Sequence, residues 1–175
     1  MLTNRARQLV IAVFILVLLF GIYEQAYEIS GIALLAIALL LWGYFKEGTV
    51  VLAAKEFHDK DYGKTEMLLI QIAKPDLLSK KRRGYYEYMM GGIELQKQDF
   101  DSAVKHYEVA VQYPLRSVND HVAALVHVAN ISLRQHHFDK AEAYLNLAKK
   151  QEDHLSSRIR EVIVKLEKEI KQRKA

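Results

Sequence analysis

The sequence predicts an all-α protein made of a two-helix transmembrane hairpin, an α-solenoid of about three helix pairs and a C-terminal capping helix. Three observations predict this fold class. Two apolar segments lie within the first 47 residues, helical periodicity runs from Val50 onward with only Pro75 and Pro114 as strong breakers, and a short motif recurs at equal spacing. The expected division is therefore a hairpin over residues 1–47 and a repeat domain over residues 48–175.

The first two expected helices are apolar on all sides. Unbroken apolar residues run from Leu9 to Phe20, and Ser30 is the polar exception in a second segment from Ile29 to Phe45. A helix that is hydrophobic all round needs lipid or a large core, so we expect membrane spans over about residues 8–23 and 29–45. Neither apolar core contains an ionisable residue, which favours an anchor over a transport path.

The charges that flank these segments predict an orientation. Arg5 and Arg7 precede the first segment, the loop from Tyr23 to Glu28 has no Lys or Arg, and Lys46 follows the second segment. The positive-inside rule then places both termini in the cytoplasm. The compact architecture suggests a bacterial protein, so the expected location is the bacterial inner (cytoplasmic) membrane. An alternative interpretation treats residues 1–22 as a cleaved signal peptide, which would reverse the sidedness of the rest.

A motif recurs three times in the remaining chain. It consists of a polar residue, an aromatic residue, two mostly polar positions and a small residue. The copies are Asp61–Thr65, Asp99–Ala103 and His137–Ala141, and their aromatic residues, Tyr62, Phe100 and Phe138, are 38 residues apart. Each copy lies between two amphipathic stretches, which predicts helix–turn–helix pairs over about residues 48–76, 82–114 and 120–151.

The last expected helix, over residues 155–173, lacks the motif and carries one apolar stripe. Lysine and glutamate cover its other side, which is typical of the capping helix that ends a repeat array. The stripe consists of Leu155, Ile159, Val162, Ile163, Leu166 and Ile170.

In these features the chain resembles the tetratricopeptide repeat (TPR) family, from about residue 48 to residue 151. The matching positions are Ala53, Tyr62 and Leu69 in the first repeat, Gly91, Phe100, Ala103, Tyr107, Ala110 and Pro114 in the second, and Ala129, Phe138, Ala141, Leu145 and Ala148 in the third. The first repeat departs from the family at Thr65 and Ile72, where alanine is usual. A period of 38 exceeds the usual 34, which we assign to longer links between the repeats.

The resemblance implies a concave surface formed by the first helix of each repeat, where a protein partner binds. Carried onto this chain, its partner-binding groove consists of Phe57, His58, Tyr85, Tyr88, Gln96, Asn130 and Arg134, with Val50, Val126 and Leu133 among its apolar positions. An alternative interpretation is that the two tyrosines pack between helices. Some relatives clamp a terminal carboxylate, but the first two repeats here supply no matching Lys or Asn to join Asn130 and Arg134.

The densest basic cluster is the run Lys80, Lys81, Arg82 and Arg83. Such a run can contact anionic lipid headgroups. The other interpretation is a solvated helix start, which the sequence favours.

Composition argues against several functional classes. The net charge of +4 is small for this chain, so nucleic acid is not an expected partner. With no cysteine, disulfides and thiolate chemistry are excluded. The histidines lack the spacing of a helical zinc site, and no catalytic motif is present. We therefore expect no enzyme activity, no cofactor, no metal and no small-molecule substrate.

The sequence thus predicts a membrane-anchored adaptor or scaffold whose expected partners are a protein and the lipid bilayer. Fold analogy suggests a role in envelope assembly, secretion or polysaccharide export. The alternative is a structural subunit of a membrane complex held mainly through its hairpin.

Overall fold

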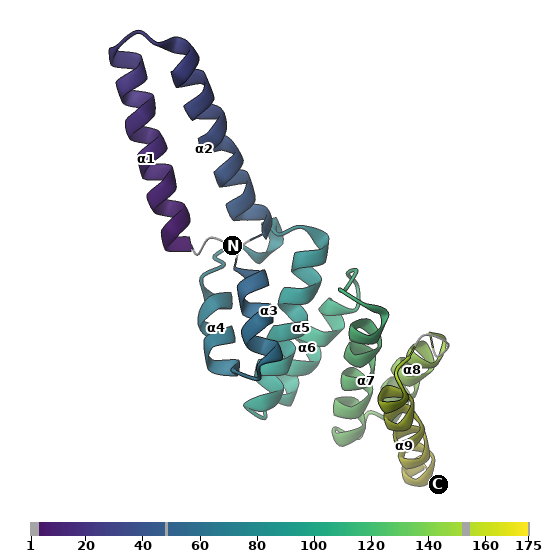
Figure 1. The fold of residues 1–175 in the computed structure, drawn as a ribbon. Coiled ribbons are helices and arrows are strands. Elements are labelled where there is room, and N and C mark those ends of the chain that lie inside the picture. Colours follow the sequence, from purple (N-terminus) through teal and green to yellow (C-terminus); the bar gives the residue numbers. More distant parts are fainter. Residues whose placement is uncertain (1–3, 48, 152–154, 175) are drawn as a thin grey trace. The chain divides into compact units, whose positions relative to one another are not determined.

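The computed structural model describes residues 4–47, 49–151 and 155–174, with side chains for all of these except 4–7, 44–46 and 174. Within these ranges the protein is all-helical, as predicted, and contains no strand (Figure 1). The helices are α1 (Asn4–Tyr23), α2 (Tyr27–Glu47), α3 (Val50–His58), α4 (Tyr62–Ile70), the 3₁₀ helix η1 (Pro75–Leu77), α5 (Lys80–Gln96), α6 (Phe100–Ala110), α7 (Val118–Arg134), α8 (Phe138–Lys149) and α9 (Ser157–Lys174).

The described part of the chain forms two compact units, which meet in sequence between Ser79 and Lys80. The first unit contains two antiparallel helix pairs, α1 with α2 and α3 with α4. The second contains α5 to α9, in which each helix packs against the next and α7 also packs against α9. The domain boundary predicted from the sequence lies between residues 47 and 48. Gly48, the junction between α2 and α3, lies outside the described residues.

The helices α1 and α2 approach closely at Gly21. A Cβ atom at this position would lie 2.6 Å from the hydroxyl oxygen of Ser30, so only glycine fits opposite that side chain. The Ser30 hydroxyl donates a hydrogen bond to the Ala26 carbonyl at 3.2 Å. Most large apolar side chains of the pair are exposed, including Leu16 at 66% and Leu39 at 63%.

The predicted two-span location in the inner membrane is wrong. Over the described residues, no helix combines the length and the apolarity that crossing a membrane requires. The apolar segments of α1 and α2, residues 9–23 and 29–45, have 15 and 17 residues. At ~1.5 Å per residue they cover roughly 22 and 25 Å, against a hydrocarbon core of about 30 Å. The side chains of Arg5, Arg7 and Lys46, on which the orientation was based, lie outside the described set.

All four helix pairs turn in the same way. One non-glycine residue in each turn has a left-handed φ, between 57° and 64°. The amide of that residue bonds to the carbonyl three positions back, and the next amide bonds to the carbonyl five positions back from itself, which is a Schellman motif. The left-handed residues are Gln25, Lys60, Gln98 and His136.

The residue five positions after each left-handed one is small and buried. It lies on the first turn of the second helix, where a small side chain lets the two backbones approach. These residues are Ser30 at 8% exposure and Thr65, Ala103 and Ala141 at 0%. The three repeats of the motif therefore share one local structure, and the α1–α2 hairpin has it too.

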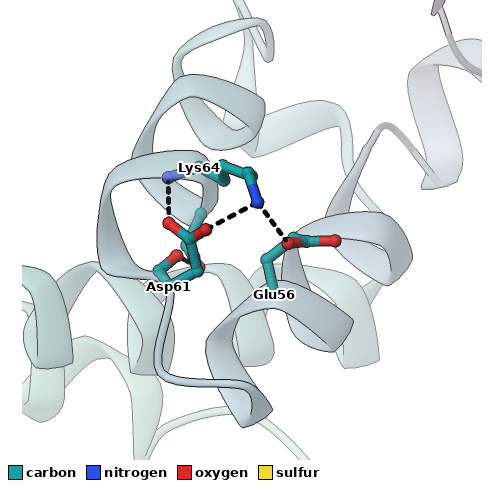
Figure 2. Close-up of polar contacts among 4 residues, drawn as sticks. Glu56, Asp61 and Lys64 are labelled. Atoms are coloured by element: carbon teal, nitrogen blue, oxygen red, sulfur yellow. Dashed lines mark hydrogen bonds and ion pairs between the residues drawn. The ribbon is translucent and has the colours of Figure 1, made fainter.

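Side chains that cap the second helices reinforce these turns. The Asp61 carboxylate accepts a hydrogen bond from the backbone N–H of Lys64 at 3.0 Å, and Asp99 does the same for Ser102 at 3.0 Å. Figure 2 shows that the Lys64 ammonium also reaches Asp61 at 2.8 Å and Glu56 at 3.8 Å. The hydrogen bond from Lys64 lowers the pKa of Asp61. This cluster fixes the end of α3 against the start of α4.

Close backbone packing holds α5 against α6. A Cβ at Gly91 would lie 3.0 Å from ring carbons of Tyr107, and one at Gly84 would lie 2.7 Å from the Cβ of Tyr113. Tyr107 is 2% exposed and belongs to a core that α6 shares with α7 through Ala124, Val128 and Ile131. Within the second unit, the pair α5–α6 is thus joined to α7 by shared apolar burial.

The C-terminal helix α9 packs on α7 and α8. Its buried residues are Leu155, just before the helix, and Ile163, Leu166 and Ile170 within it, all part of one core with Leu125, Leu133 and Leu145. Ile159 packs at the edge of this core. Val162, the other member of the predicted stripe, is 40% exposed.

Candidate binding groove

The seven residues predicted for a partner-binding groove are divided between the two units. Phe57 and His58 lie on α3 in the first unit, and the other five lie on α5 and α7 in the second. Phe57 packs edge to face on Tyr62 at 5.5 Å between ring centroids, and His58 is exposed. Three apolar positions that the resemblance assigned to the groove are instead core residues: Val50 at 0%, Val126 at 8% and Leu133 at 1% exposure.

Tyr85 and Tyr88 of α5 belong to a row of packed rings. Tyr85 is 6% exposed and stacks on Tyr88 at 5.8 Å, and Tyr88 meets Tyr107 edge to face at 5.8 Å. Burial raises the pKa of the Tyr85 phenol, and the carboxylate of Asp120 adds to this effect. The alternative interpretation from the sequence, that Tyr85 packs between helices, fits this burial. Gln96 is exposed at the end of α5.

The ring row continues into α7. The imidazole of His127 stacks on Tyr107 with 4.7 Å between ring centroids and 12° between planes. Burial lowers the pKa of His127 to about 4, so the ring is neutral at physiological pH. His127 is therefore a packing residue whose charge is suppressed.

Asn130 and Arg134 meet side chains of α9 and form a groove. The groove has a volume of about 520 Å³. Its lining consists of Asn130 and Arg134 from α7 and Val162, Lys165, Leu166, Glu169 and Arg173 from α9. We call this set the α7–α9 groove. It lies entirely within the second unit.

The groove combines an apolar floor with charged walls. Leu166, at 5% exposure, and Val162, at 40%, supply the apolar surface. The Arg134 side chain is exposed, and its guanidinium also lies over the Phe100 ring of α6 at 5.6 Å. Arg173 pairs with Glu169 at 2.7 Å. Three cationic groups and one carboxylate line the groove, so its lining is net positive.

Sequence reasoning found the α7 side of this groove and missed the α9 side. Lys165, Glu169 and Arg173 are spaced by four residues, which places them along one face of a helix. Val162 is on the same side of α9, at the border of the apolar stripe. This spacing was a usable signal, but a capping helix was expected only to cover the core.

The predicted lipid-contact run begins α5. Lys80 and Lys81 are exposed, and Arg82 is half-buried. Arg83 pairs with Glu87 at 2.9 Å, and Glu87 is 4% exposed. His106 on α6 approaches the other oxygen of Glu87 at 2.6 Å. Arg83 thus helps to join α5 to α6 through a buried carboxylate.

The structure assembles no metal-ligating cluster from the residues it describes, because no three His, Cys, Asp or Glu side chains converge. The neighbouring His136 and His137 lie at the α7–α8 turn, where His136 packs on Phe138 at 5.9 Å. No residue in the α7–α9 groove therefore has the partners of a metal ligand.

Comparisons of the chain with models of protein families, with curated proteins and with solved structures found no match.

Proposed function

We propose that the chain is a protein-interaction scaffold, in which a series of TPR-like helix pairs presents the α7–α9 groove to a segment of a partner protein. The observation that carries this proposal is the groove itself. Asn130 and Arg134, chosen from sequence as binding residues, border it together with side chains of the capping helix.

The composition of the groove supports binding to a protein. Arginine is enriched at the energetic centres of protein interfaces, and an apolar floor with a polar rim is their usual arrangement. The groove is open to solvent on a surface fixed by the shared core of α7, α8 and α9. A rigid surface loses little conformational entropy when a partner binds.

The repeat architecture supports the same proposal. Within the second unit, the pairs α5–α6 and α7–α8 have equivalent turns 38 residues apart, and α9 ends the series. Arrays of this kind present extended binding surfaces because each repeat packs only against its neighbours. A scaffold or adaptor role follows from such a surface.

The experiment is affinity purification of the tagged full-length chain, followed by identification of the captured proteins. The test variant carries Asn130→Ala and Arg134→Ala. The control carries Asn146→Ala and Arg160→Ala, which remove the same residue types from exposed positions outside the groove. A partner captured by wild type and control but lost by the test variant supports the proposal. A partner set that is identical for all three proteins contradicts it.

A second candidate function is that of a structural subunit that joins a larger complex through the α1–α2 hairpin. The observation that favours it is the exposed apolar surface of this pair, for example Ile32 at 69% and Trp42 at 68%. A variant with Leu16→Gln and Leu39→Gln changes two exposed positions of the hairpin and leaves the groove intact. Loss of partners in this variant, with retention in the groove variant, supports this second candidate.

A further inference from the structure

We propose that the α7–α9 groove selects an acidic, partly apolar peptide segment, with a glutamate or aspartate side chain between Arg134 and Lys165 and a neighbouring apolar side chain on Val162 and Leu166. This inference rests on the proposed function and adds the chemistry of the partner.

The charges of the groove favour a carboxylate on the bound segment. Its one carboxylate, Glu169, is engaged by Arg173 at 2.7 Å. Lys165 and Arg134 are exposed, and they come from different helices, α9 and α7. A carboxylate that enters between them meets two cations on a surface whose own acid is already paired. Complementary charge of this kind raises both selectivity and the association rate.

The apolar floor favours an apolar side chain on the same segment. Val162 is 40% exposed, although the residues around it in the stripe, Ile163 and Leu166, are 1% and 5% exposed. Covering Val162 with an aliphatic side chain removes apolar surface from water. A simple anion such as phosphate leaves this surface open, so the groove is better suited to a peptide with both acidic and apolar residues.

Asn130 is suited to hydrogen bonding with the backbone of the segment. Its amide has both a hydrogen-bond donor and an acceptor, which match the carbonyl and N–H of an extended peptide backbone. It lies four residues before Arg134 on α7, so both side chains lie on the same face of that helix. The groove thus has cationic side chains for the charge of the peptide, apolar side chains for its apolar residue and an amide for its backbone.

The test measures binding of a fluorescein-labelled peptide of alternating leucine and glutamate to the full-length chain by fluorescence anisotropy. A matched peptide has glutamine in place of every glutamate. The test variant is Lys165→Glu, and the control is Lys168→Glu, which makes the same charge change at an exposed position of α9 outside the groove. Circular dichroism checks that each variant retains its helical content.

We expect the glutamate peptide to bind at least about tenfold more tightly than the glutamine peptide, because a close interfacial charge pair contributes on the order of 1.5 kcal/mol or more. Lys165→Glu should remove most of this preference and Lys168→Glu should retain it. Equal affinity for the two peptides overturns the proposal, as do equal losses in the two variants. Displacement of the glutamate peptide by inorganic phosphate at comparable concentration also overturns it, because the site then binds anions without selecting peptide.

Failure of this inference is distinguishable from failure of the proposed function. If the glutamine peptide binds as well as the glutamate peptide, and Asn130→Ala with Arg134→Ala weakens both, the groove binds protein segments without an acidic preference. If neither peptide binds but affinity purification finds a groove-dependent partner, the scaffold function stands and the acidic segment is wrong. If neither assay depends on the groove, both proposals fail.

Discussion

Gly91 of α5 lies directly against the ring of Tyr107 on α6, and three ring carbons would be 3.0 to 3.1 Å from a Cβ at this position. This contact sets the distance between the two helices of the second repeat, because Tyr107 is fully enclosed by α6, α7 and the other rings of its row.

Gly91→Ala should therefore destabilise the protein by about 1 to 2 kcal/mol, since overpacking costs ~1–3 kcal/mol and the better helix propensity of alanine returns up to ~1 kcal/mol. The matched control is Gly63→Ala on α4, where the nearest atom outside the helix backbone is Asp61 Oδ1 at 3.8 Å. This control should be neutral or slightly stabilising. Denaturant unfolding of the full-length chain measures both, and a Gly91→Ala variant as stable as wild type contradicts the packing described.

His127 should make stability depend on pH below neutrality. Burial lowers its folded-state pKa from 6.5 to about 4, so the unfolded chain binds a proton at higher pH than the folded chain does. Stability is then lost as pH falls from about 6.5 through 4, by up to roughly 3 kcal/mol at ~1.4 kcal/mol per pKa unit.

Substitution His127→Phe retains a ring against Tyr107 and removes the titration. Its unfolding free energy should fall less than that of wild type between neutral pH and pH 4. Burial also lowers the pKa of His121, which acts in the same direction, so part of the slope should remain in this variant. Identical pH profiles for the two proteins would show that His127 is protonated equally in both states.

Asp99 should contribute stability that disappears in acid. The N–H of Ser102 donates to its carboxylate and lowers its pKa from the ordinary 3.8. A depressed folded-state pKa gives stability that is fully present above the unfolded value and is lost as pH falls through the folded value. Asp99→Asn keeps a good capping residue that does not titrate. Its melting temperature should match that of wild type near neutrality and decline less below pH 3.8.

Tyr144 should resist deprotonation at high pH. Burial and a hydrogen bond from its hydroxyl to Glu108 at 3.0 Å raise its pKa to about 12. Because the folded chain keeps this proton and the unfolded phenol loses it near pH 10, the associated stability is lost as pH rises from 10 through 12. The ultraviolet titration of wild type minus that of Tyr144→Phe isolates this phenol. A difference curve with its midpoint at the ordinary value of 10 would refute the assignment.

The helix pairs were predictable because their signal is local and repeated. Tyr62, Phe100 and Phe138 each begin the second helix of a pair, and the small residues that follow are buried. An aromatic residue and a small residue at fixed spacing depend only on the turn and the helix after it. The hairpin turn at Gln25 has the same hydrogen bonds, but Ala26 occupies the position where the motif has a polar residue. The motif therefore did not identify this turn.

Other features depended on tertiary contacts and were not predictable in this way. Periodicity marks one face of α7 but does not say which part of that face α9 will cover, so Leu133 was assigned to a surface and is a core residue. Apolar runs likewise do not show what surrounds a helix, so α1 and α2 were interpreted as membrane spans, whereas no described helix has the length and apolarity to cross a membrane. The α9 side of the groove required the packing of α9 on α7 to be known.

Because the turns at Gln98 and His136 are equivalent, the segment between them is a unit by which the series of helices can be lengthened. Residues 99–136 begin and end at the same structural position, so a tandem duplication of this segment would join His136 to a new Asp99 in the setting where it now meets His137. Each added copy would supply one second helix and one following first helix, with the capping helix still last. Duplication at these turns would therefore add whole helix pairs, and the new junction between His136 and Asp99 would have the backbone geometry of the existing turns.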